Sequence, residues 1–304
     1  MYRVKDKAKG TFAVFNTDIG RAMATRVVQD QRLRLAVRDR QFCCAYQPKV
    51  DIRTQEVVGV EALVRLRDEH GLMNAPSAFI SLAAELGLMD ELTRLVLADI
   101  VKSLDAIDEA FGADTPISVN VAAKQAMDTK FMHSFCDDLQ ATHCPGRFVV
   151  EVTEDAFIAK SDFQADIVPM LHELGVRVSI DDFGTGYSSL SALSEITADE
   201  IKIDRSFISD IHRRPRSQRV LKAIESLGNA LGMQVMVEGV ETFEELVYLQ
   251  SQTGIRHGQG YYFAKPILMD SIVRPRQSRG RALSDIHDEF SAHRRGFRGG
   301  RSRG

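Results

Sequence analysis

Residues 178–190 read Val178-Ser-Ile-Asp-Asp-Phe-Gly-Thr-Gly-Tyr-Ser-Ser-Leu190. The β-branched run over residues 176–180 predicts a short buried strand, and Asp181 and Asp182 come where that strand should end. Ser188 and Ser189, after the Gly-Thr-Gly turn, can cap a following helix. Adjacent carboxylates repel one another at neutral pH, so a divalent cation is their most economical partner. Taken alone, however, the stretch is better explained as a solvated acidic turn, because Asp and Gly dominate turns.

The chain around this stretch alternates between short apolar strands and amphipathic helices. Strands are predicted at residues 42–50, 57–66, 117–121, 148–152, 176–180, 200–203, 234–237 and 260–263. Helices are predicted at residues 18–40, 76–86, 91–111, 124–142, 162–174, 188–193, 215–231 and 242–252. Eight strands separated mostly by helices predict an α/β fold, a (β/α)8 barrel. Only six residues separate the first two strands. Since that is too short for a parallel crossover, we expect these two strands to form an antiparallel hairpin.

The composition indicates a globular chain with an acidic body. Its 304 residues, 44% of them hydrophobic, have a formal net charge of −3. Nine Arg and three acidic residues follow residue 273, a net of +6, so residues 1–273 carry −9. An acidic body is a poor match for a general nucleic-acid binder, and no DNA binding is predicted. Residues 270–304 form a basic Arg/Gly-rich tail, which we expect to be disordered because it has little apolar surface to bury. Contact of this tail with RNA or anionic lipid is an alternative to a merely solvated tail.

The sequence gives no sign of a membrane span or of export. No apolar run approaches the ~18 residues of a transmembrane helix, and the N-terminus lacks the apolar core of a signal peptide. The cysteines Cys43, Cys44, Cys136 and Cys144 show no metal-ligand spacing, which predicts buried thiols in a reducing compartment. We therefore expect a cytoplasmic domain, although upstream segments of a longer protein could tether it to a membrane.

Charged or amide side chains occur at or near the carboxyl ends of the last seven predicted strands. They are Glu61, Asn120, Glu151, the pair Asp181 and Asp182, Lys202, Glu238 and Gln259. In a barrel these strand ends converge on one mouth, where active sites of this fold are built. Any one of these residues is most simply a satisfied turn residue, but so many carboxylates on one rim would be destabilising without cations.

The residue types at this rim indicate the chemistry. Ligands that offer only oxygen select Mg²⁺, Mn²⁺ or Ca²⁺, and the absence of His from the set argues against zinc. A lysine in such a pocket can orient or deprotonate water, or pair with an anionic substrate oxygen. Two metals that share an Asp, together with this lysine, are equipped for in-line attack on a phosphodiester.

The complete motif set resembles that of EAL-domain phosphodiesterases, which hydrolyse cyclic di-GMP to linear pGpG in bacterial second-messenger signalling. The matching motifs are Tyr46-Gln-Pro, Glu61-Ala-Leu-Val-Arg65, Phe79-Ile, Ser118-Val-Asn120, Glu151-Val-Thr-Glu154, Asp181-Asp-Phe-Gly-Thr-Gly-Tyr-Ser-Ser-Leu190, Ile201-Lys-Ile-Asp-Arg-Ser-Phe207, Glu238-Gly-Val-Glu-Thr242 and Gln259-Gly-Tyr. The resemblance covers residues 42–269. It implies a barrel whose first strand is antiparallel, in agreement with the predicted hairpin.

The resemblance also implies a role for each matching residue. The ligands of one metal would be Glu61, Asn120, Glu151 and Asp181. Asp181 and Asp182 would hold a second metal, with Glu238 as a further ligand or a partner of the water. Mg²⁺ or Mn²⁺ would support the reaction, and Ca²⁺ would inhibit it.

Further roles concern the nucleophile and the substrate. Lys202 would activate or position the nucleophile, and Gln259 would support metal-bound water or the substrate. The positions that contact substrate would be Gln47, Leu63 and Arg65, and the guanidinium fork of Arg65 suits a phosphate. Glu154 would brace the loop of residues 182–190, through which the family resemblance implies a homodimer.

Residues 1–41 resemble the end of a GGDEF domain followed by a linker helix, because Met1-Tyr-Arg-Val-Lys fits the recurring Met-Tyr-x-Ala-Lys of that end. We therefore expect this chain to follow sensory or GGDEF domains in a longer protein. A receptor that binds cyclic di-GMP without cleaving it is the alternative to an enzyme. Degenerate members of the family lose metal ligands or the Asp-Asp-Phe-Gly-Thr-Gly loop, and because both are present here the enzyme is favoured.

Overall fold

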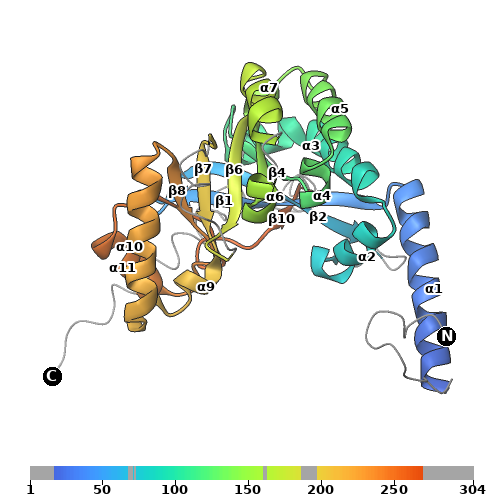
Figure 1. Cartoon of the computed structure of the whole chain (residues 1–304), viewed down its shortest axis with the longest axis horizontal. Helices are drawn as coiled ribbons and strands as arrows, with labels where there is room; N and C mark the ends of the chain where they lie inside the picture. The colour runs from blue at the N-terminus through green and yellow to red at the C-terminus, as the bar shows by residue number, and fades with distance from the viewer. Residues whose placement is uncertain (1–16, 68–70, 72, 160–162, 186–196, 270–304) are drawn as a thin grey trace, which may run out of the picture.

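Eight parallel or antiparallel strands close into a barrel in this protein, for which the computed structural model describes residues 17–67, 71, 73–159, 163–185 and 197–269 (Figure 1). The barrel strands are β1 (Phe42–Asp51), β2 (Val57–Arg67), β4 (Ile117–Asn120), β5 (Phe148–Thr153), β6 (Arg177–Phe183), β7 (Glu200–Ile203), β8 (Gln234–Val237) and β9 (His257–Gly258). From β2 to β9 each strand pairs in parallel with the next, and β1 closes the ring by pairing antiparallel with both β2 and β9. The predicted (β/α)8 barrel with an antiparallel first strand is thus confirmed.

Two short strands extend this sheet beyond the ring. β3 (Met73–Asn74) pairs with the end of β2, and β10 (Ile267–Leu268) pairs with β1 at Ala45 and Tyr46. β1 is therefore held by three other strands: β2 along one edge, and β9 and β10 at different heights along the other.

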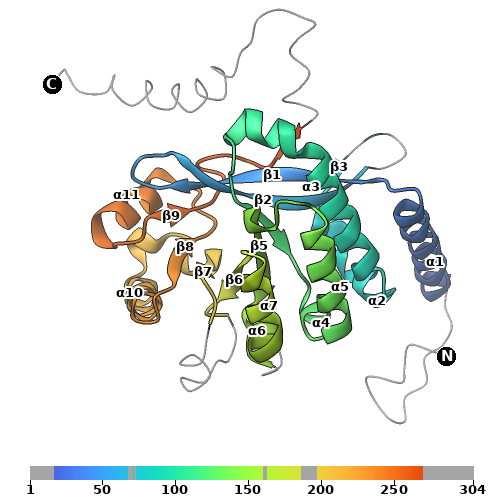
Figure 2. The same ribbon diagram turned by 90° about the horizontal axis from the view of Figure 1, so that it is seen from above.

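Helices cover the outside of the barrel (Figures 1 and 2). The longer ones are α3 (Met89–Phe111), α5 (Thr129–Gln140), α10 (Pro215–Ala230) and α11 (Phe243–Gln252), and the shorter ones are α2 (Ile80–Glu85), α4 (Ala123–Ala126), α6 (Glu154–Ala159), α7 (Val168–Glu173) and α9 (Arg205–Ile208). Single helical turns lie at Pro76–Ala78, Pro145–Arg147, Phe163–Ile167 and Ile211–Arg213. On α3 the buried residues Leu92, Val96 and Ile100 recur at four-residue steps, so one face of the helix packs on the barrel.

The barrel strands divide their side chains between an apolar outer face and a polar interior. Val119, Val150 and Ile201 are fully buried in the core that joins strands to helices. Their neighbours along the strands point the opposite way because side chains alternate along a strand. These inward residues include the buried polar side chains Ser118, Glu151, Ser179, Glu200 and Lys202. The interior of the barrel is therefore lined by polar and charged groups.

The prediction of a strand at residues 260–263 is wrong. The eighth strand is β9, and the chain turns immediately after it. A Cβ atom on Gly260 would lie 2.1 Å from the Val240 carbonyl oxygen, so only glycine allows this close approach. The same carbonyl accepts a hydrogen bond from the Tyr262 backbone N–H at 3.0 Å. In the aromatic run that suggested a strand, Phe263 is buried and Tyr262 packs against the core, whereas Tyr261 is 56% exposed.

Several predicted helices differ in detail. Residues 124–142 form α4 and α5 rather than one helix, because Asp128 caps the second helix by accepting from the N–H groups of Lys130 and Phe131. Of the helix predicted at residues 162–174, the described part begins as a π-helical turn at Phe163–Ile167 and continues as α7. The helix predicted at residues 188–193 lies outside the described residues.

Helix α1 (Thr17–Arg38) lies at the side of the barrel away from α10 and α11, and much of it projects from the body (Figure 1). Its end packs through Leu33 and Val37 on a cluster that contains Phe79 and Leu88. The Met1-Tyr-Arg-Val-Lys motif that resembles a GGDEF end and the basic tail of residues 270–304 lie outside the described residues. None of the described helices combines the length and apolarity that crossing a bilayer requires.

The cysteines are single thiols. All four lie in the described part of the chain and none forms a disulfide. Cys44 and Cys136 are buried, as predicted, whereas Cys43 and Cys144 are only half-buried.

Candidate active site

Lys202 occupies the centre of the barrel mouth, the end at which strands β2 to β9 finish. It is 1% exposed, and its Nζ lies 2.7 Å from Glu151 Oε2, 3.1 Å from Asp181 Oδ1 and 2.6 Å from Glu238 Oε1. Glu61 Oε2 is 3.8 Å away. Burial alone would lower the pKa of Lys202, but these carboxylates outweigh it and raise that pKa well above its ordinary value. One ammonium group thus neutralises part of an acidic cluster gathered from four strands or strand ends.

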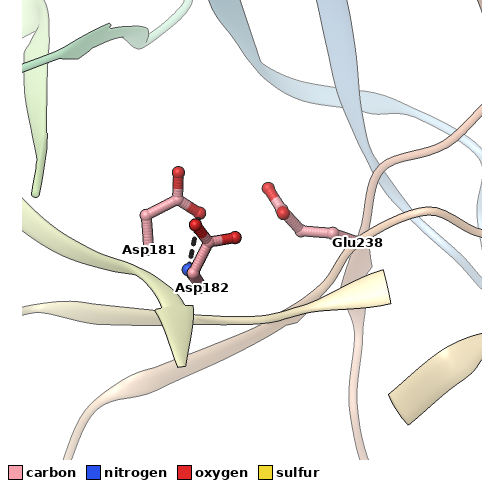
Figure 3. Close-up of side chains that lie close together, drawn as sticks. All are labelled: Asp181, Asp182 and Glu238. Carbon is pink, nitrogen blue, oxygen red and sulfur yellow. Dashed lines mark hydrogen bonds between the residues drawn. The ribbon is translucent and has the colours of Figure 1, made fainter. Parts of the chain in front are cut away.

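Asp181, Asp182 and Glu238 form the part of this cluster that faces outward. One carboxylate oxygen of each lies within 4.8 Å of the others, a spacing that can hold a metal ion. Figure 3 shows the three side chains pointing toward a common space, with the Asp182 backbone N–H donating to Asp181 Oδ1 at 3.0 Å. Asp182 has a left-handed φ of 55°, a conformation that Asp tolerates better than most residues. This turn of the backbone brings two adjacent carboxylates to the same side of β6.

Two carboxyl groups at the mouth, Asp182 and Glu238, have raised pKa values. Burial is the main cause that raises the pKa of Glu238 to about 8; Lys202 opposes the shift, and the negative charges of Asp181 and Glu61 add to it. Burial, followed by repulsion from Asp181, also raises the pKa of Asp182. A bound cation would offset this repulsion and stabilise the ionised form of both carboxylates.

Glu61, Asn120 and Gln259 meet on the other side of the mouth. Asn120 Nδ2 donates to Glu61 Oε1 at 2.7 Å, and Gln259 Nε2 donates to Glu61 Oε2 at 2.8 Å. Gln259 comes directly after β9, so its amide also reaches the mouth. Among the residues that the structure describes, Gln259 Oε1 is a buried oxygen without a hydrogen-bond partner. An orphaned buried acceptor of this kind is suited to a cation or to a bound water.

These donors fit a hard divalent cation. The side chains offer carboxylate and amide oxygens alone, which suits Mg²⁺, Mn²⁺ or Ca²⁺. The structure brings together all the predicted metal ligands: Glu61, Asn120, Glu151, Asp181, Asp182 and Glu238.

The predicted substrate-contacting residues lie near this acidic cluster. Leu63 and Arg65 lie two and four residues after Glu61 and therefore share its face of β2, nearer to the end of the strand. Arg65 is half-buried, its Nη1 donates to the Val64 carbonyl at 2.9 Å, and burial lowers its pKa. Gln47 is buried beside the cluster, where its Oε1 accepts from Gln259 Nε2 at 3.1 Å.

Glu154 lies where the sequence placed a brace for the loop. It begins α6, and its Oε2 accepts a hydrogen bond from the Gly184 N–H at 2.7 Å. Gly184 has a φ of 95°, and a Cβ atom there would come within 2.9 Å of the Phe207 ring. This contact fixes the start of the loop. Residues 186–190, which complete the predicted dimer contact, lie outside the described residues.

A second layer of charge lies beneath the mouth and was missed from the sequence. Lys49 is 5% exposed, and its Nζ lies 2.7 Å from Glu151 Oε1 and 3.3 Å from Glu200 Oε1. Burial works against the ionised form of Glu151, but Lys202 and Lys49 outweigh it and lower its pKa to about 2. A signal was present, because Lys49 follows Gln47 by two residues in a mostly apolar strand and therefore shares its inward face.

Comparisons with known proteins are consistent with this geometry. The family model described as "EAL domain" matches residues 30–266. Cyclic di-GMP phosphodiesterase PdeR of Escherichia coli (strain K12) is 37% identical over 271 residues, which are 88% of this chain and 40% of that protein. Signaling protein YkoW of Bacillus subtilis (strain 168) is 33% identical over 88% of this chain and 33% of its own length. This chain thus spans less than half of these two relatives.

Among solved structures, a complex described as "PaMucR Phosphodiesterase, c-di-GMP complex" has a TM-score of 0.74 at 32% identity. The match covers 81% of this chain and 99% of that one. The barrel and its helices are therefore shared with a protein whose structure was solved with cyclic di-GMP.

Proposed function

Since the chain belongs to the EAL-domain family, we propose that it hydrolyses cyclic di-GMP to linear pGpG with two divalent cations at the barrel mouth. The observation that carries this proposal is the intact acidic cluster around the buried Lys202. A family member that only bound the nucleotide would have no need to keep four carboxylates within 3.8 Å of one buried ammonium group.

The residues of the mouth divide between the two cations. Glu61, Asn120, Glu151 and Asp181 would hold the first, and Asp181 and Asp182, with Glu238 as ligand or water partner, would hold the second. When bound, divalent cations lower the pKa of water and polarise phosphoryl oxygens.

The remaining residues orient the reactants. The Lys202 ammonium group donates hydrogen bonds from the centre of the cluster, so it would position the attacking water or a phosphate oxygen. Gln259 Oε1, which has no hydrogen-bond partner within the described part of the chain, would accept a hydrogen bond from water. Arg65, farther along β2, would bind a phosphate through its guanidinium fork, with Gln47 and Leu63 beside it.

We expect Mg²⁺ or Mn²⁺ to support hydrolysis and Ca²⁺ to block it while still allowing cyclic di-GMP to bind. Oxygen ligands admit all three ions, but Ca²⁺ takes more ligands at longer distances and polarises water less. The measurement is a metal titration in which pGpG formation, followed by chromatography, and cyclic di-GMP binding are recorded side by side.

Two outcomes would contradict this expectation. Equal turnover in Ca²⁺ and Mg²⁺ would rule out water activation by a tightly ordered pair of cations. Binding without turnover in every metal would favour a cyclic di-GMP receptor over an enzyme.

A further inference from the structure

Glu151 lies between two buried lysines that approach its two carboxylate oxygens separately. Lys202 Nζ is 2.7 Å from Oε2, and Lys49 Nζ is 2.7 Å from Oε1. Glu151 itself is 1% exposed. Each carboxylate oxygen of Glu151, a candidate metal ligand, therefore contacts the ammonium group of a different lysine.

The two lysines come from opposite ends of the barrel interior. The other carboxylates around Lys202 belong to the mouth. Lys49 instead borders a cavity of about 20 Å³ at the amino-terminal ends of the parallel strands, together with Gly59, Pro116, Arg177 and Gln234. This cavity is too small to admit more than about one water molecule. Lys49 therefore acts on Glu151 from beneath, shielded from bulk solvent.

Lys49 is also prevented from moving toward the mouth. Its second partner is Glu200 Oε1 at 3.3 Å. Glu200 is itself fixed by Ser179 Oγ, which donates to Oε1 at 2.9 Å, and by Gln234 Nε2, which donates to Oε2 at 3.0 Å. A lysine anchored in this way keeps a positive charge next to Glu151 Oε1.

A divalent cation that reaches Glu151 from the mouth meets Oε2 first. To bind Oε1 as well, it would have to come close to the fixed ammonium group of Lys49, and like charges repel strongly in a buried site. Glu151 can thus offer one oxygen to a metal at the mouth. Ca²⁺ takes six to eight ligands and readily binds both oxygens of a carboxylate, whereas Mg²⁺ needs six ligands in a tight octahedron.

We propose that Lys49 is a positioning residue that restricts Glu151 to a single metal–oxygen bond and thereby favours Mg²⁺ over Ca²⁺ at the mouth. The inference rests on the metal site of the proposed function, but it concerns the choice of ion and not the hydrolysis. The sequence motifs imply no role in metal choice for Lys49, because the first motif ends at Pro48 and the next begins at Glu61.

The ratio of the two metal affinities separates this role from a merely structural one. Mg²⁺ and Ca²⁺ carry the same charge, so loss of the Lys49 charge would change the Coulomb attraction of both ions to a similar extent. A general loosening of the barrel would likewise weaken both. Release of Glu151 Oε1 for a second metal–oxygen bond would instead favour Ca²⁺, because Ca²⁺ accepts more ligands than Mg²⁺.

The test compares the full chain with two variants. Lys49→Met/Glu200→Gln removes both ends of the lower ion pair, so no charged group is left buried without a partner at that level. Glu200→Gln is the matched control, because it makes the same change at Glu200 and leaves Lys49 on Glu151. Dissociation constants for Mg²⁺ alone and for Ca²⁺ alone are measured by titration calorimetry without nucleotide.

In the double variant the affinity ratio is expected to shift toward Ca²⁺ by about tenfold, within the usual effect of groups bonded to metal ligands. Glu200→Gln should keep the ratio of the parent. If the double variant loses cooperative thermal unfolding, Lys49→Gln carries the same comparison, because it removes the charge and keeps a neutral donor.

Three results would overturn the inference. An unchanged ratio after the loss of Lys49 would show that Oε1 is not what restricts the site. An equal shift in Glu200→Gln would assign the effect to Glu200. A parent chain that binds neither ion would contradict the proposed metal site as well as this inference. If the parent binds Mg²⁺ and hydrolyses cyclic di-GMP but the double variant keeps the parent's affinity ratio, only the inference is refuted.

Discussion

Glu61→Gln is expected to reduce the hydrolysis of cyclic di-GMP by about a thousandfold or more while leaving the fold intact. Glu61 would be a ligand of the first cation, and the stabilisation that such a cation gives to the transition state is worth several kcal/mol. Glutamine has nearly the same shape and keeps oxygen and nitrogen atoms near Asn120 and Gln259, which contact Glu61 at 2.7 and 2.8 Å. Burial raises the pKa of Glu61, so a neutral group at this position should not lower the free energy of unfolding of the metal-free protein. Both turnover and thermal unfolding should be measured.

Asp51→Asn is the matched control for this variant. Asp51 and Glu61 are both 6% exposed carboxylates. Asp51, however, lies at the end of the barrel away from the mouth, where it pairs with Arg256 at 2.6 Å. Its replacement should lower the unfolding temperature and preserve turnover in the folded protein. Glu61→Gln activity close to that of the parent would mean that Glu61 is not a metal ligand.

Lys202→Met is expected to destabilise the metal-free protein by about 3–5 kcal/mol, the usual loss when one partner of a buried ion pair is removed. Four carboxylates would lose the ammonium group that lies within 3.8 Å of each of them. Because bound cations would take over this charge compensation, Mg²⁺ should restore much more stability to the variant than it adds to the parent. Turnover at saturating Mg²⁺ should still fall by about a hundredfold or more, since the group that positions the nucleophile is missing.

Urea unfolding with a chelator and with saturating Mg²⁺ gives the two free energies of unfolding for each protein. Lys222→Met, which removes an exposed lysine from α10, is the control and should change neither stability nor turnover. If Lys202→Met were equally destabilised with and without Mg²⁺, the metals and Lys202 would not share the same carboxylates.

Much of the fold was predictable because the barrel strands have strong local signals. The bounds of β7 and β8 match the prediction from apolar and β-branched residues alone. The error at residues 260–263 has a tertiary cause. Gly260 lies against the backbone of Val240, and a contact between segments that are distant in sequence has no local signal.

The candidate site was predictable to the extent that polar residues interrupt apolar strands. Glu151 and Lys202 stand out in this way, and the barrel topology brings them to 2.7 Å. The lower layer was not predicted, because only the carboxyl ends of the strands were considered functional. Lys49 belongs to the antiparallel strand, whose carboxyl end points away from the mouth, so the rule for the ends of parallel strands does not apply to it.

The closure of the barrel through β1 has a consequence for how the protein folds during synthesis. The free edge of β1 is completed only by β9 and β10, and the Ile52 N–H donates to the Arg256 carbonyl, about 200 residues farther along the chain. Contacts between such distant residues form slowly, and strand edges that wait for a partner are prone to aggregation. Almost the whole barrel therefore has to be synthesised before both edges of β1 are paired. Protection of the Ile52 amide from hydrogen exchange would report that the barrel has closed.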